Sequence, residues 1–160
     1  MLNNRSLTRR QVIHTGLGVL VLAGLAAGTQ ASPARHLVVY KSPSCGCCGG
    51  WTNIVSRAGF LVEVHDRDNL DPIKKQARVP EDLAACHTAV LGNYVVEGHV
   101  PIEALEKLLA EQPPVHGIAV PGMPAGSPGM GEDATAQYDV IAFTLDDPDG
   151  RSLFMRIGGP

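Results

Sequence analysis

Three cysteines fall within the four residues 45–48, between a strand pattern and a helix pattern. The β-branched run 36–41 stops at a Ser-Pro-Ser turn that leads directly into the cysteines. After them, apolar residues recur at i, i+3, i+4 and i+7, which gives a helix one apolar face: Trp51, Ile54, Val55 and Ala58. The pattern predicts strand, loop and helix, with the cysteines at the N-terminus of the helix.

The chain then continues to alternate between strands and helices. Residues 60–65 alternate as a second strand, and Asp71-Pro72 begins a short helix that runs through Arg78. Residues 88–91 and 94–97 flank a two-residue Gly-Asn turn, which is typical of a β-hairpin. A further helix begins at Pro101 and has a mostly leucine face. The order βαβαββα predicts an α/β fold with a thioredoxin-like core.

The C-terminal third has a different character. Residues 112–137 show no apolar periodicity but are rich in proline and glycine and repeat Pro-Gly-Met at 121–123 and 128–130. Loops of this length in compact domains are usually functional or disordered. Residues 138–145 and 151–157 flank a polar turn and predict a closing hairpin. We therefore expect a long Pro/Gly/Met loop followed by a C-terminal β-hairpin.

The first 31 residues have the composition of an export signal. Arg5, Arg9 and Arg10 precede an uncharged apolar run at 17–27, and small residues offer cleavage near Ala31. The run is too short for the ~20 residues of a membrane-spanning helix. Residues 8–13, Thr-Arg-Arg-Gln-Val-Ile, also resemble the twin-arginine export signature. We expect a signal peptide at 1–31 and a periplasmic protein.

Charge and length limit what the remaining chain can be. Three of the thirteen basic residues and none of the sixteen acidic ones lie in 1–31, so the mature chain has a formal charge of −6. This balance argues against a nucleic-acid partner. No second apolar span follows Ala31, so no membrane span is expected in the mature chain. Residues 32–160 suit a single metal-binding domain.

The chemistry of the chain centres on its four cysteines. Backbone N–H groups at a helix N-terminus lower thiol pKa values and favour thiolate, the form that binds metal or attacks a disulfide. Cys45 and Cys48 have redox C-x-x-C spacing, but the extra Cys47 favours a metal. Cys86 precedes the third predicted strand, where the fold would bring it to the others. Thiolates select Cu(I), with zinc and silver as alternatives, and four sulfurs could bridge several Cu(I) ions.

Four segments carry a resemblance to a known family: 40–51, 86–89, 97–101 and 117–124. They resemble, in this order, the uncharacterised periplasmic metal-binding family that includes the copper-resistance protein CopG. The resemblance implies a thioredoxin-like fold, a periplasmic location and a role in copper resistance and homeostasis. It implies copper held by the cysteines Cys45, Cys47, Cys48 and Cys86. We expect copper ions and other periplasmic copper-handling proteins as partners. The resemblance also makes copper redox activity a candidate role for the protein.

Other interpretations stay open at this point. A metal-independent thiol-disulfide oxidoreductase would use Cys45 and Cys48, which are the candidate catalytic residues for any thiol or copper oxidoreductase activity. Four cysteines could also form a structural pair of disulfides. Further candidate ligands offer imidazole or thioether groups, but each could equally serve in packing or hydrogen bonding: His87, His99, His116, Met123 and Met130.

Overall fold

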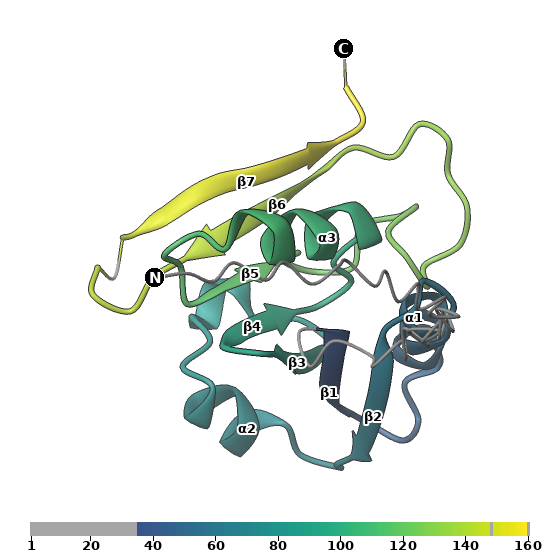
Figure 1. Ribbon diagram of the computed structural model, residues 1–160. Helices are drawn as coiled ribbons and strands as arrows, with labels where there is room; N and C mark the ends of the chain where they lie inside the picture. Colours follow the sequence, from purple (N-terminus) through teal and green to yellow (C-terminus); the bar gives the residue numbers. More distant parts are fainter. Residues whose placement is uncertain (1–34, 148, 160) are drawn as a thin grey trace, which may run out of the picture. The chain divides into compact units, whose positions relative to one another are not determined.

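A computed structural model describes residues 35–147 and 149–159 (Figure 1). The predicted signal peptide, its cleavage near Ala31 and the twin-arginine pattern lie outside these residues and stay predictions. Within the described part of the chain, no helix has both the length and the apolar character needed to cross a membrane.

Seven strands form one mixed sheet with the order β2-β1-β3-β4-β5-β6-β7. The pairs β1–β2 and β4–β5 are parallel and the other pairs are antiparallel. The strands are β1 (His36–Lys41), β2 (Leu61–Asp66), β3 (His87–Leu91), β4 (Tyr94–Glu97), β5 (Gly117–Ala119), β6 (Tyr138–Phe143) and β7 (Arg151–Ile157). The predicted α/β class is confirmed.

The helices are few and lie where the sequence predicts them. They are α1 (Gly46–Arg57), α2 (Asp71–Gln76) and α3 (Ile102–Glu111), with a short 3₁₀ turn, η2 (Glu81–Leu83), before β3. Gly59, with φ +91°, follows the end of α1 and lets the chain turn into β2. The predicted order from β1 to α3 is therefore present, with η2 added.

The main hydrophobic core lies between the sheet and the apolar faces of α1 and α3. Trp51 and Val55 of α1 and Leu105 and Leu108 of α3 are fully buried. Burying each such side chain contributes about 1.5–3 kcal/mol. The Trp51 indole N–H also donates a hydrogen bond to the Val100 carbonyl at 2.8 Å. This packing fixes α1, and with it the cysteines at its N-terminus.

The predicted loop at 112–137 differs from the structure in one respect, because it contains β5. This strand has only three residues, too few for an apolar period to be recognised, and all three are buried. The rest of the loop passes beside α1 (Figure 1). A Cβ on Gly129, which has φ +90°, would lie 2.5 Å from the Cys47 carbonyl oxygen, so the loop contacts the first turn of α1. The predicted C-terminal hairpin is present as β6–β7, with β6 ending at Phe143.

Candidate metal centre

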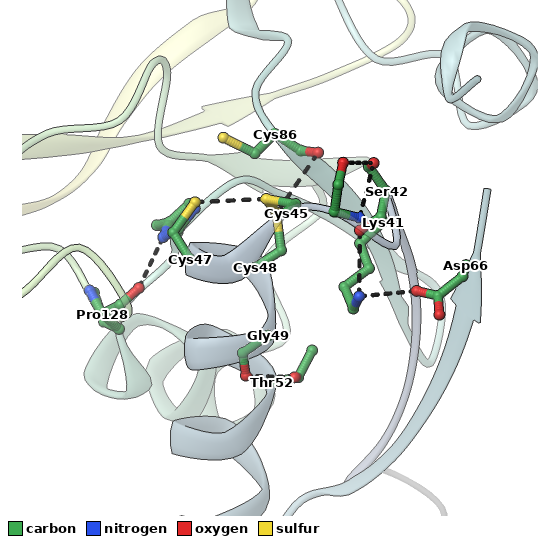
Figure 2. Close-up of a disulfide and its surroundings, with 12 residues drawn as sticks. Lys41, Ser42, Cys45, Cys47, Cys48, Gly49, Thr52, Asp66, Cys86 and Pro128 are labelled. Atoms are coloured by element: carbon green, nitrogen blue, oxygen red, sulfur yellow. Dashed lines mark hydrogen bonds and ion pairs between the residues drawn. A yellow bond between two sulfur atoms is a disulfide. The ribbon is translucent and has the colours of Figure 1, made fainter. Parts of the chain in front are cut away.

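The four cysteine sulfurs lie within 4.8 Å of one another. Figure 2 shows three of them at the start of α1, with Cys86 approaching from the loop before β3. Strand pairing explains this approach, because β3 lies beside β1 in an antiparallel register that places His87 opposite Lys41. The beginning of β3 therefore meets the end of β1, where the turn toward Cys45 starts. Cys48 is fully buried and the other three cysteines are half-buried.

Cys45 and Cys48 form a disulfide, while Cys47 and Cys86 are free. The structural pair of disulfides considered above is therefore not formed. The free Cys47 sulfur lies 3.5 Å from the Cys45 sulfur. Reducing the disulfide with two electrons and two protons would make all four sulfurs available as thiols.

The environment of Cys86 differs from that of a cysteine on a helix. Burial raises the pKa of the Cys86 thiol, and the nearby Cys47 raises it further, while Lys74 opposes the shift. Cys86 lies on the loop between η2 and β3 and not on a helix. A metal ion overcomes such a raised pKa because its charge stabilises the thiolate that binds it.

A second group of ligating atoms shares Cys48 with the first and is more deeply buried. Cys48, His87 and His99 are all fully buried, and their ligating atoms lie within 4.8 Å of one another. His99 Nδ1–H donates to the Pro128 carbonyl oxygen at 2.8 Å. Both ring nitrogens of His87 and Nε2 of His99 have no hydrogen-bond partner within residues 35–147 and 149–159.

Burial keeps both imidazoles neutral. It lowers the pKa of His87 to about 3, with further lowering by the positive charge that His99 would carry. Burial also lowers the pKa of His99, and the hydrogen bond to Pro128 opposes that shift. A neutral imidazole is the form that binds metals.

Glu97 anchors the loop that carries Cys86. Its side chain is fully buried; one carboxylate oxygen accepts hydrogen bonds from Lys74 and from the Ala85 N–H, and the other accepts one from the Thr88 hydroxyl. Ala85 and Thr88 flank Cys86 and His87 in the chain. Burial raises the pKa of Glu97, while the Lys74 charge and the donated bonds lower it. The carboxylate thus holds the loop at both sides of Cys86.

Replacing Glu97 by Gln should destabilise the protein by about 2 kcal/mol, because hydrogen bonds to a charged group contribute about 1.5–3 kcal/mol and Lys74 would lose its counter-charge. Urea unfolding of the metal-free protein measures the change. Glu111→Gln, at an exposed position on α3, is the matched control and should leave stability within about 0.5 kcal/mol. An equally small effect of Glu97→Gln would contradict the anchoring role.

The remaining predicted ligands lie apart from these groups or have another visible role. His116 Nε2 hydrogen-bonds with the Ala77 carbonyl at 2.8 Å and its ring packs edge-on against Phe143. His116 belongs to neither group of ligating atoms. Met123 is 57 % exposed on the long loop, and Met130 is half-buried there. Ligand roles for these methionines stay predictions.

The sequence reasoning missed two features. It considered His87 and His99 one at a time and did not bring them together with Cys48. It also overlooked Glu97 as an anchor, although a carboxylate directly after Val95 and Val96 in a buried strand is a signal that it needs buried partners.

Comparison with known proteins reveals relatives of the chain. Two solved structures, titled as Form 1 and Form 2 of the copper resistance protein CopG, each match with 34% sequence identity and a TM-score of 0.70. The match to Form 1 covers 79% of this chain and 99% of that chain, and the match to Form 2 covers 76% and 97%. The chain belongs to the CopG family.

The match to the CopG structures extends over most of the chain, whereas the family-model match is local. The model described as "Protein of unknown function, DUF411" matches residues 83–130, which include Cys86, His87 and His99 but not the cysteines of α1. No curated protein matches the sequence significantly.

Proposed function

We propose that the protein binds Cu(I) in the periplasm through Cys45, Cys47, Cys48 and Cys86 and serves copper resistance or homeostasis. One observation carries the proposal: four soft sulfur donors gather within 4.8 Å in a chain of the CopG family. Thiolates prefer Cu(I) among the metals that a periplasmic protein meets. The donor set therefore fits copper, the metal to which the CopG relatives confer resistance by name.

The arrangement of the sulfurs favours a thiolate-bridged cluster over a single ion. Cys47 and Cys48 are adjacent in α1, so their side chains point about 100° apart around the helix axis. Cys48 is fully buried while Cys47 is half-buried. Two neighbouring thiolates that diverge in this way serve different ions more easily than one, and a thiolate has lone pairs to bridge between ions.

The thioredoxin-like fold and the periplasmic location belong to the same proposal. The strand order β2-β1-β3-β4, with β1 and β2 parallel and the helices α1 and α3 between strands, supports a thioredoxin-like core to which β5, β6 and β7 are added. The basic and apolar pattern at 1–31 supports export to the periplasm. There, copper would pass to and from other copper-handling proteins.

Anaerobic loading with Cu(I) tests the proposal. Reduced mature protein should retain about one copper ion per chain or more after desalting, with sulfur ligation in X-ray absorption, because thiolates bind this ion strongly. A cluster would add short copper–copper distances. Zinc, offered in competition, should not displace the copper. Retention of clearly less than one copper per chain would contradict the proposal.

A thiol-disulfide oxidoreductase is the second candidate, because Cys45 and Cys48 already form a disulfide with the free Cys47 beside them. Oxidation of the two thiols releases two electrons and two protons. A disulfide substrate would take up both, whereas two Cu(II) ions would take up the electrons and the protons would pass to solvent. A metal-independent oxidoreductase would reduce disulfides in metal-free buffer. This activity would survive the substitution Cys47→Ser. Activity that requires copper would favour the copper oxidoreductase instead.

A further inference from the structure

Among the residues that the structure describes, three buried ring nitrogens near Cys48 have no hydrogen-bond partner: Nδ1 and Nε2 of His87 and Nε2 of His99. Leaving a buried polar atom unpaired costs about 1–3 kcal/mol, so such atoms are rare in native proteins. An apolar side chain at His87 would avoid this penalty. Three such atoms gathered near one sulfur therefore indicate that this place in the core binds something.

The contacts of His99 define which of its nitrogens is free. A carbonyl oxygen only accepts hydrogen bonds, so the bond to Pro128 places the proton of the neutral ring on Nδ1. The lone pair is then on Nε2, which makes it the His99 nitrogen that can bind a metal. His99 offers a ring nitrogen within 4.8 Å of ligating atoms of Cys48 and His87. Histidines that bind metals characteristically donate their other N–H to a backbone carbonyl or a carboxylate.

His87 is held in place without using its nitrogens. Its ring packs against the Trp51 indole, with 4.4 Å between ring centroids, and lies 5.0 Å from the His99 ring in an edge-on arrangement. Trp51 is itself fixed by its hydrogen bond to Val100. Packing thus orients the imidazole and leaves both of its nitrogens available.

We propose that Cys48, His87 and His99 form an inner Cu(I) site that shares the Cys48 sulfur with the outer group of cysteines. This inference rests on the proposed function and adds two imidazole ligands to it. The site requires the Cys48 thiolate, so a dithiol must first reduce the Cys45–Cys48 disulfide, becoming a disulfide itself as Cys45 and Cys48 become thiols. The Cys48 thiol proton passes to solvent when copper binds.

Charge balance selects a monovalent ion for this site. One thiolate and two neutral imidazoles carry a single negative charge, which Cu(I) neutralises. A divalent zinc ion would leave a net positive charge in the fully buried core, where an uncompensated charge is expensive. The nearby buried carboxylate of Glu97 is already paired with Lys74 and offers no compensation.

Burial separates the two groups in accessibility. The three outer cysteines that are not shared, Cys45, Cys47 and Cys86, are half-buried. Cys48, His87 and His99 are fully buried. Copper would therefore meet the outer sulfurs first and reach the imidazoles through Cys48. We expect inner copper to exchange with chelators more slowly than outer copper.

X-ray absorption on the reduced, Cu(I)-saturated mature protein tests the inner site. The wild type should show imidazole scattering together with sulfur scattering. The variant His87→Phe/His99→Asn should keep the sulfur signal, lose the imidazole signal and bind about one copper fewer per chain, because it lacks both nitrogen ligands. In His99→Asn the side-chain amide can still donate to Pro128, so this single variant removes Nε2 while preserving the loop contact.

His116→Asn is the matched control, because His116 lies in neither ligand group, and it should leave the spectrum unchanged. Sulfur-only scattering in the copper-loaded wild type would overturn the inner site and leave the proposed function standing. An imidazole signal that persists in both His99→Asn and the double variant would also overturn it. Failure of the wild type to retain copper would overturn both proposals.

Discussion

Replacing Cys48 by Ser is expected to weaken Cu(I) binding by at least roughly 100-fold. Removing a residue that only hydrogen-bonds to a metal ligand already costs about 10- to 100-fold in affinity, and Cys48 is proposed as a ligand itself. Cys48 is the one residue that belongs to both groups of ligating atoms. A serine hydroxyl is a hard, weakly acidic donor and does not replace a thiolate toward Cu(I). The substitution would thus remove a ligand from the outer group and disconnect the two imidazoles from it.

Competition with a Cu(I)-specific chromophoric chelator under anaerobic conditions measures this loss. Cys86→Ser is the matched control, because Cys86 belongs only to the outer group, and it should weaken binding less than Cys48→Ser does. Circular dichroism of each variant establishes that it is folded. Wild-type affinity in folded Cys48→Ser protein would contradict the central role of this sulfur.

Acid is expected to destabilise the metal-free protein strongly through His87. Burial lowers the pKa of this imidazole from an ordinary 6.5 to about 3 in the folded state. Between these two values the unfolded chain takes up a proton that the folded chain refuses, so the free energy of unfolding falls as pH falls. The slope is about 1.4 kcal/mol per pH unit. From pH 6.5 to pH 4.5 the loss should be roughly 2–3 kcal/mol.

Urea unfolding at several pH values measures this loss, and His87→Phe separates it from the titration of other groups. The raised pKa of Glu97 acts in the opposite direction, because it removes stability as pH rises through that pKa. The difference between wild type and variant therefore isolates His87. The variant should be at least as stable as the wild type near neutral pH, since it removes two unpaired nitrogens, and clearly more stable at pH 4.5. Equal pH slopes in the two proteins would contradict this account.

Local patterns predicted most of the elements correctly. The apolar spacing after the cysteines predicted α1, and the Gly-Asn turn predicted the hairpin of β3 and β4. Both signals depend on residues within one or two turns of chain, which is why they can be recognised without tertiary contacts. β5 was missed because a three-residue strand has no period, and its pairing with β4 and β6 alone defines it.

The candidate site was predictable only in part. Three cysteines at the start of a helix are visible in the sequence, and the expected fold placed Cys86 near them. The sequence left several cysteine pairings open, and the structure shows that Cys45 and Cys48 are the bonded pair. His116, His87 and His99 looked alike as candidate ligands, and only their surroundings in the fold separate the first from the other two.

The sequence by itself determined which donors the chain offers: soft sulfur atoms, concentrated at a helix N-terminus by their spacing along the chain. The tertiary structure decided which donors meet and which are shielded from water. The register of β3 against β1 brings Cys86 to α1, and packing of Trp51 and the long loop buries His87 and His99 beside Cys48. Burial arises from contacts among segments far apart in the chain, so no local pattern could have distinguished these two imidazoles from exposed ones.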